Sequence, residues 1–562
     1  MVKTTSPDKE KQGRAYHWLM LSAFAVSGYL CFVNLDYAAL WYDEGATAGI
    51  AKNLIERGDI IGWDGRNLIG GTNGRSLNED LRDVFPPLMY VWTALGFKLF
   101  GVNEVGARIV HALIGLLALG VFYLLLRQHL PKHDRLVCNI FVLAAGSAQM
   151  LLYFRQSRYY AFMALGLIAS FYLYERYWQE KKTRHLAALT LVGAAAFFNH
   201  YSGGTATVLA VAAWHVLFRA RETTAREWTA FATCVSAIAL AGLGYLVFMG
   251  LVGAERTGFL SYSGRISVGH YQGTIGVLLL RILVYTRELF TADWVSWPVA
   301  LWFLYALWQT RQTSESEREG LPVAGTSKIV LMGILFTFFA AATSQYPMRP
   351  HAGAELRYYV SALPLLLAMK GAFVEWVWPR SKITALIILM FMLYTSAGAF
   401  PFNVRMGFSG FPTLGMHLTQ FIAEIHHPYR DSIREVSDYL LTHAKQDEKV
   451  YVKDFGARES LIFYLGDRVF FCCVLDENSL FPPNHFNKEL YAEKDTADWI
   501  VVFGKLPSNT EAELEDEYRL VARFDVHPYP TQRPEINLHA FQPLPVKDGV
   551  RIWRRTKERT AP

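Results

Sequence analysis

Cysteine and charge are both scarce in this sequence. Only five of its 562 residues are cysteines, and only 19% of its residues are charged. Three of the cysteines lie within apolar segments, and the other two, Cys472 and Cys473, are adjacent rather than spaced like metal ligands. The sequence therefore predicts neither a disulfide framework nor a cysteine-based metal site.

Several other features are missing. The net charge of +6 is too small to indicate a nucleic-acid surface, so no nucleic-acid partner is expected. The chain has no internal repeat and no low-complexity segment. Nothing before Tyr16 resembles a cleavable signal, so we expect the first apolar segment to remain as a membrane span.

The chain has an abundance of long apolar segments instead. Its residues are 52% hydrophobic and its mean hydropathy is +0.17, which is typical of a polytopic membrane protein. Segments of about twenty apolar residues are long enough to cross a bilayer. We expect about eleven spans, at 16–34, 104–127, 136–153, 159–178, 185–199, 201–219, 228–250, 294–311, 327–344, 356–376 and 383–400.

The charges of the loops orient these spans. Basic loops face the cytoplasm, and all of them fall on one side of the membrane if 88–101 and 273–290 do not cross it. We therefore expect those two segments to be helices at the outer interface. The basic loops are 127–135, 175–184, 219–226, 311–328 and 378–382.

The part of the chain after Phe400 is expected outside, and its character changes. Residues 430–562 are polar, with a predicted helix at 431–444 and predicted strands at 449–453, 468–474 and 498–503. The predicted fold is mainly α: a polytopic transmembrane helical bundle at 1–405, with outer-face interfacial helices, and a small external α/β domain at 430–562.

Two adjacent acids follow the first span. Asp43 and Glu44 come directly after Leu40-Trp41-Tyr42 and precede a predicted short helix at 47–57. Acids at the mouth of a membrane helix bundle usually have a chemical use. They could instead cap the helix that starts near Thr47, because acids favour helix N-termini.

Arginines and aromatic residues are expected on the same outer side. Arginine binds phosphate through a planar fork of donors, and a carboxylate can remove a proton from a hydroxyl. Aromatic faces suit sugar rings, so the set indicates a phosphosugar site at the membrane–water boundary. The arginines could instead anchor helix ends among lipid headgroups, and the histidine could be a simple turn residue. The residues are Arg155, Arg158, Arg357, Tyr42, Tyr159, Tyr358 and His200.

Several short motifs together carry a family resemblance over roughly residues 16–400. The chain resembles polyprenyl-phosphate-dependent C-type glycosyltransferases, most of all the protein-O-mannosyltransferase and lipid A aminoarabinose transferase group of the cell envelope. The matching pieces are Asp43-Glu44, Phe85-Pro86-Pro87-Leu88, 97–104 followed by Ala107-Arg108, 155–161, and Arg357-Tyr358 before Leu363-Pro364.

The resemblance implies a chemistry. It is the inverting transfer of a sugar from a polyprenyl-phosphate donor to a hydroxyl on a lipid, glycan or protein acceptor. Asp43 matches the acid that acts as base, and Glu44 matches the second acid of the pair. Arg357, Arg158 and Arg155 are candidates for the donor phosphate. Tyr42, Tyr159, His200 and Tyr358 are candidates for substrate contact.

The resemblance also implies a location and leaves one cofactor open. Enzymes of this kind work in the bacterial cytoplasmic (inner) membrane, among membrane lipids, with the site facing the periplasm or exterior. The motif before the fourth span often carries a further acid, but Gln156 and Ser157 stand here. We therefore predict no metal ligands, although a divalent metal stays open as a cofactor. The aminoarabinose transferase has a lysine before the double proline, where this chain has Phe85.

Two other functions remain as alternatives. An oligosaccharide ligase or polymerase shares the fold and the outer-face site. A lipid or polysaccharide transporter would place charged residues inside several spans, and the spans here are nearly free of acids.

Overall fold

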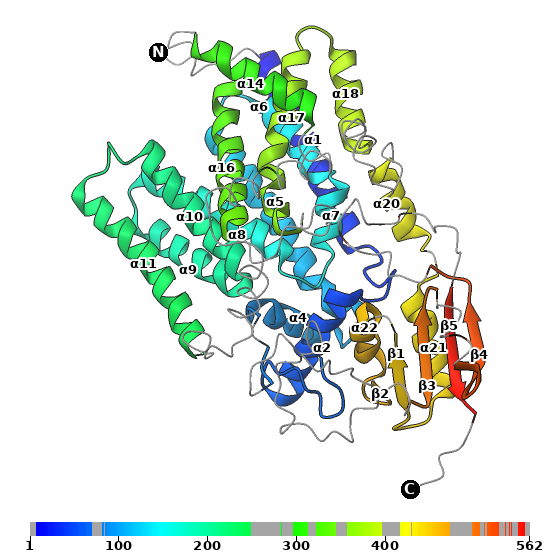
Figure 1. Cartoon of the computed structure of the whole chain (residues 1–562). Coiled ribbons are helices and arrows are strands. Elements are labelled where there is room, and N and C mark those ends of the chain that lie inside the picture. The colour runs from blue at the N-terminus through cyan, green and yellow to red at the C-terminus, as the bar shows by residue number, and fades with distance from the viewer. Residues whose placement is uncertain are drawn as a thin grey trace.

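The computed structural model describes most of the chain. The described residues are 7–69, 81–83, 85–248, 283, 296–312, 322–343, 357–395, 416–428, 430–453, 455–471, 497–505, 511, 514–527, 534, 539, 541 and 549–556. A long helical bundle occupies the upper and left parts of the molecule, and a small sheet lies at the lower right (Figure 1).

Helices make up the bundle and its connections. Their bounds are α1 (Pro7–Phe32), α2 (Tyr42–Arg57), α4 (Leu88–Phe100), α5 (Glu104–His129), α6 (Asp134–Ala145), α7 (Ala148–Phe154), α8 (Tyr160–Glu180), α9 (Thr183–Asn199), α10 (Tyr201–Phe218), α11 (Ala225–Phe248), α14 (Trp297–Arg311), α16 (Pro322–Thr343), the 3₁₀ helix η2 (Val360–Ala362), α17 (Leu363–Val377), α18 (Lys382–Tyr394), α20 (His417–His426), α21 (Ser432–His443) and α22 (Phe455–Leu465).

The described part of every expected span coincides with one or two of these helices. Among the described residues, six helical segments are long and apolar enough to cross a membrane, and α6 with α7 makes a seventh if this pair, bent by 55°, is one span. Helices α9, α14 and α18 have 17, 15 and 13 residues, too short to be counted alone. The chain is thus a multi-pass membrane protein, and the number of about eleven spans stays a prediction.

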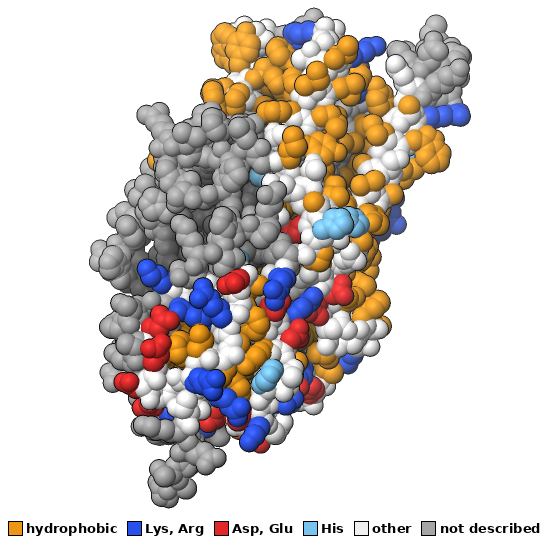
Figure 2. Space-filling model, turned by 90° about the vertical axis from the view of Figure 1, so that its right-hand side faces the viewer, with side chains coloured by type: hydrophobic (Ala, Val, Ile, Leu, Met, Phe, Trp, Pro, Cys, Tyr) orange, Lys and Arg blue, Asp and Glu red, His pale blue; other side chains and the backbone are white. Residues whose placement is uncertain are grey.

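The surface of the bundle is apolar where lipid would contact it. Leu113 and Leu117 on α5, Leu191 on α9 and Ile387 on α18 are all more than half exposed. Such a surface would be unstable in water but matches lipid tails. On the face shown in Figure 2, hydrophobic side chains cover the upper part and charged side chains gather over the lower part.

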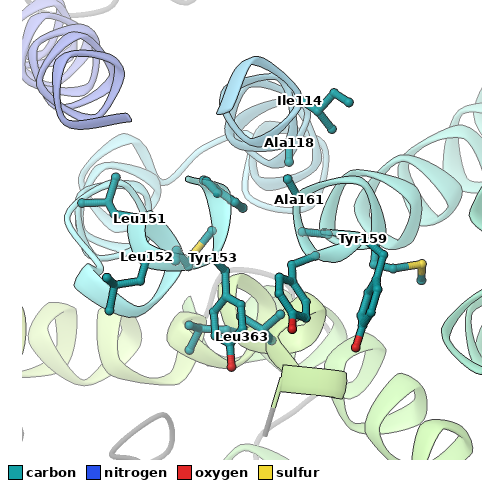
Figure 3. Packing of buried hydrophobic residues seen from close by; sticks show 14 of the residues in the cluster. Ile114, Ala118, Leu151, Leu152, Tyr153, Tyr159, Ala161 and Leu363 are labelled. Atoms are coloured by element: carbon teal, nitrogen blue, oxygen red, sulfur yellow. The ribbon is translucent and has the colours of Figure 1, made fainter. Parts of the chain in front are cut away.

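Small residues let the central helices approach closely. Ala118 of α5 faces Ala161 of α8, and both are fully buried (Figure 3). In the same view the ring of Tyr153 on α7 extends toward Leu363, the first residue of α17. Alanine contacts of this kind bring helix backbones together without a gap. The central helices α5, α7, α8 and α17 are thereby held in fixed positions.

A helix is present at the first segment that we expected at the interface. Helix α4 packs against α5 at Gly96, where a Cβ atom would lie 2.0 Å from the carbonyl oxygen of Gly106. Its opposite face exposes Val91, Leu95 and Leu99, at i, i+4 and i+8. The interfacial placement of α4 stays a prediction. The second such segment, 273–290, lies outside the described residues apart from residue 283.

The polar C-terminal part forms a five-stranded sheet. The strands are β1 (Lys449–Val452), β2 (Phe470–Phe471), β3 (Trp499–Phe503), β4 (Tyr518–Phe524) and β5 (Val550–Arg555), in the order β2-β1-β3-β5-β4. Strand β1 pairs in parallel with β2 and β3, whereas β5 is antiparallel to β3 and β4. The three expected strands and the helix at 431–444 are confirmed, although residues 472–474 of the second strand lie outside the described residues.

The C-terminal part is joined firmly to the first loop. Helix α22 lies beside α2 (Figure 1). At Gly45 a Cβ atom would be 2.6 Å from the Cα of Ser460, so only glycine permits this contact. The side chain of Asn67 donates to the carbonyls of Gly466 and Val469 and accepts from the Phe471 amide. The boundaries 1–405 and 430–562 stay a prediction.

Candidate active site

Helix α2 begins earlier than the sequence indicated. It starts at Tyr42 rather than near residue 47, so Asp43 and Glu44 lie in its first turn. The N-cap position belongs to Trp41, which has extended backbone and makes no capping hydrogen bond through its side chain. The two carboxylates are therefore not N-caps, and each contacts a different set of side chains.

Glu44 is completely buried and fully engaged. Its Oε1 accepts from Arg108 Nε at 2.9 Å and from the Ser157 amide at 2.8 Å, and its Oε2 accepts from Arg108 Nη2 at 2.7 Å. Arg108 also donates to the carbonyls of Leu35, Ala38 and Ala39. This geometry gives Glu44 the role of fixing α2 to α5 and to the loop before α8.

Asp43 is at the edge of the protein interior and faces two arginines. Its Oδ2 accepts from Arg357 Nη1 at 2.6 Å and lies 3.9 Å from Arg158 Nη2. The side chain of Asp43 is 13% exposed. Arg158 also donates to Thr47 Oγ1 at 2.8 Å and to the Asp43 carbonyl at 3.3 Å. Residues from α2, the loop before α8 and the approach to α17 thus meet at one carboxylate.

Aromatic rings stack beside these arginines. The rings of Tyr159, His200 and Tyr358 contact one another: the His200 centroid is 4.1 Å from Tyr159 and 5.6 Å from Tyr358, and the two tyrosine centroids are 6.2 Å apart. Arg158 lies over the Tyr159 ring and Arg357 over the Tyr358 ring, both at 5.3 Å. The two arginines and the three rings thus form one cluster next to Asp43.

His200 has a structural contact as well. Its Nδ1 accepts from the Gly203 amide at 3.1 Å, which caps the start of α10. Burial lowers its pKa to about 3, and the positive charges of Arg158 and Arg357 act in the same direction. The imidazole is therefore neutral at neutral pH and suited to stacking rather than to carrying charge.

Arg155 and Tyr42 differ from the other predicted site residues. Arg155 donates to the carbonyls of Leu30, Val33 and Asn34 at 2.7–2.8 Å, which ties down the end of α1. The structure does not bring it to Asp43. Tyr42 opens α2 beside Asp43 and is half-buried.

The sequence analysis missed Asp83. This buried residue accepts from the Phe85 amide and from the Tyr90 hydroxyl, both at 2.9 Å. Burial raises its pKa to about 7, although those hydrogen bonds and the nearby charge of Arg158 act against the shift. Its position two residues before Phe85-Pro86 was the signal that could have identified it.

The described residues near this site include few side chains that could bind a divalent metal. Within the described part of the chain, no group of three or more His, Cys, Asp or Glu side chains could hold a metal ion. The carboxylates of Asp43 and Glu44 are both engaged by arginines.

Comparisons with known proteins show what the chain resembles. Residues 85–243 match the family described as dolichyl-phosphate-mannose-protein mannosyltransferase. An uncharacterized protein of Aquifex aeolicus is 29% identical over 161 residues, which is 27% of this chain and 28% of that protein's length.

The solved structures match along almost the whole chain. ArnT from Cupriavidus metallidurans bound to undecaprenyl phosphate has a TM-score of 0.57 and 15% identity, over 96% of this chain and 98% of that one. The same protein in its apo state has a TM-score of 0.56 and 15% identity, over 91% and 97%. The predicted mainly helical fold is confirmed as the ArnT fold, and with the family match over residues 85–243 the predicted resemblance to C-type glycosyltransferases of the protein-O-mannosyltransferase and aminoarabinose transferase group is confirmed.

Proposed function

We propose that this chain is an integral-membrane glycosyltransferase. It moves one sugar from a polyprenyl-phosphate donor to a hydroxyl acceptor, with inversion, at the outer face of a bacterial cytoplasmic membrane. The observation that carries the proposal is the Asp43 carboxylate, held 2.6 Å from Arg357 and 3.9 Å from Arg158 at one end of the bundle. The family match over residues 85–243 and the ArnT fold support the same chemistry.

Arg357 and Arg158 are suited to the donor phosphate. Their guanidinium groups lie at the end of the bundle, next to half-buried or buried aromatic rings. A phosphate that arrives there takes charge-assisted hydrogen bonds from both forks. As the bond from the anomeric carbon to the phosphate oxygen breaks, the oxygen keeps the electron pair, and the arginines stabilise the developing charge.

Asp43 is suited to act as the base. Both arginines approach its Oδ2, so Oδ1 is the oxygen that can accept a hydrogen bond from an acceptor hydroxyl. The acceptor oxygen forms its bond to the anomeric carbon on the face opposite the phosphate while Asp43 takes the proton. The sugar ring lies against the stacked Tyr159, His200 and Tyr358 side chains.

A transfer assay tests the proposal. The purified full-length chain is incubated with radiolabelled polyprenyl-phosphate sugars and a membrane extract, and labelled products are separated. Asp43→Asn should abolish transfer but keep donor binding, because an amide cannot take the proton. Asp36→Asn, an exposed acid before the same helix, is the matched control and should keep wild-type turnover.

Three outcomes contradict parts of the proposal. Near-normal transfer by Asp43→Asn shows that the base lies elsewhere. Transfer of a whole oligosaccharide from a lipid diphosphate indicates a ligase or polymerase. Movement of labelled lipid across the membrane without any new glycosidic bond indicates a transporter.

A further inference from the structure

A cavity lined by charged and apolar side chains lies at the end of the bundle away from Asp43. The ends of α5, α8 and α10 and the start of α16 line it, with a volume of about 680 Å³. We call this cavity the distal pocket. Arg108 contacts Glu44 near the start of α5, whereas Gln128 and His129 line the distal pocket at its end. At 1.5 Å per residue, the two sites are about 31 Å apart along the helix.

Positive charge exceeds negative charge in the lining. Arg219 lies 3.5 Å from Glu175 and 3.3 Å from Glu222, so this one cation is shared by both acids. Glu175 also accepts from the Trp214 indole at 2.6 Å. Lys132 and Lys328 line the same cavity, and neither forms an ion pair with the described residues. The pocket therefore offers two ammonium groups to a ligand.

Buried polar atoms in the lining also have unused hydrogen-bonding capacity. Both amide atoms of Gln128, the Nε2 atom of His129 and the Nε atom of Arg219 are buried and find no partner among the described residues. Such atoms are rare in folded proteins because leaving them without partners costs free energy. His129, Glu175, Arg219 and Lys328 all line this cavity.

We propose that the distal pocket binds a phosphate ester, either the headgroup of an anionic lipid or a soluble phosphate compound. Lys132 and Lys328 supply the charge and, with three N–H bonds each, the hydrogen-bond donors. A phosphate offers more acceptor oxygens than a carboxylate does, so it satisfies more of these donors at once. Basic pockets between membrane helices suit lipid headgroups, and Trp214 and Phe218 add an apolar wall for the carbon atoms beside the phosphate.

The distal pocket is separate from the proposed transfer site. Its distance from Asp43 is too great for a bound phosphate to touch the reacting atoms. Its ligand would stabilise the packing of α5, α8, α10 and α16, which all contribute to the lining. Phosphate binding in the distal pocket can therefore be tested independently of the glycosyltransferase activity.

Thermal unfolding of the full-length chain in a neutral detergent tests the proposal. A ligand that binds only the folded state raises Tm. The probes are phosphatidylglycerol, inorganic phosphate and, as the lipid without phosphate, dioleoylglycerol. We expect phosphatidylglycerol to raise Tm and dioleoylglycerol to leave it unchanged. The double variant Lys132→Gln/Lys328→Gln should need about tenfold more phosphatidylglycerol for the same shift, since charged hydrogen bonds are lost.

Further variants keep the result interpretable. Lys382→Gln removes an exposed lysine at the start of α18, outside the pocket lining, and should respond like the wild type. Lys132→Gln alone changes an exposed loop residue, so it tests the response to phosphatidylglycerol if the double variant does not fold. Lys328→Arg keeps the cation and should keep the response.

The probes distinguish the sources of the phosphate. A pocket-dependent shift with inorganic phosphate as large as that with lipid assigns the site to a soluble phosphate ester. A shift with lipid alone assigns it to a headgroup. The proposal is wrong if no phosphate probe raises the Tm of the wild type, or if the lysine variants respond like the wild type to every probe.

Discussion

Replacement of Glu44 separates a positioning role from a catalytic one. In Glu44→Ala the buried Arg108 loses the carboxylate with which it pairs at 2.7–2.9 Å, and the Ser157 amide loses its acceptor. Two unit charges about 4 Å apart attract by about 4 kcal/mol at an effective dielectric constant near 20. Breaking a buried pair from one side costs about 3–5 kcal/mol, which agrees with that figure.

The assay combines stability with turnover. We expect Glu44→Ala to lower the free energy of unfolding by about 3–5 kcal/mol, and Glu44→Gln to lower it less, because the amide oxygen still accepts hydrogen bonds. Unfolding in denaturant gives the stability, and the transfer assay is normalised to the folded fraction. Glu56→Gln is the matched control on α2, since Glu56 is half-exposed and 4.0 Å from Lys52. An exposed pair of this kind contributes at most about 1 kcal/mol.

One result would refute the positioning role. If Glu44→Gln keeps the wild-type stability but loses transfer per folded molecule, Glu44 takes part in the chemistry itself. If stability falls and the folded fraction still transfers sugar, the ion pair with Arg108 is structural.

Three further predictions concern the donor, the buried acid and the topology. Arg357→Lys and, more strongly, Arg357→Ala should raise the donor concentration for half-maximal rate; unchanged donor dependence would make Arg357 a lipid anchor. Asp83 has a pKa raised from 3.8 to about 7, so the folded state holds its proton longer than the unfolded state does. The stability that this protonated group contributes is therefore lost as pH rises from about 4 to about 7, so the Tm of the wild type should fall over that range. In Asp83→Asn the Tm should fall less steeply over the same range; an equally steep fall would contradict this. A single cysteine in place of the exposed Lys445 should react with a membrane-impermeant reagent in intact cells, whereas one in place of the exposed Lys182 should be protected; the reverse pattern would contradict the topology.

The arrangement of apolar segments made most of the bundle predictable. Spans such as 104–127 are recognisable because lipid-facing and buried positions are both apolar, and α5 follows this segment closely, at Glu104–His129. The start of α2 was harder to predict, because Trp41 caps it without the polar side chain that usually indicates an N-terminus. The expected number of spans depended on loop charge rather than on helix length.

The roles of neighbouring site residues could not be separated from the sequence. Adjacent residues of a helix point about 100° apart, so Asp43 faces Arg357 while Glu44 faces Arg108. Arg155 and Arg158 are three positions apart in a loop, and only the folded backbone shows that the first contacts carbonyls of 30–34 and the second contacts Asp43. Asp83 could not be predicted from the sequence for the same reason, because its raised pKa results from burial in the folded structure, near Arg158.

The contact between α2 and α22 has a consequence for the order in which the protein is made. Residues 455–465 leave the ribosome after every described helix of the bundle has been synthesised, yet they press against Gly45 in the turn that carries Asp43. Part of the packing surface of the helix with the proposed base is therefore supplied only by the late-made domain. A nascent chain whose synthesis has not passed residue 465 therefore lacks this contact against the turn that carries the proposed base.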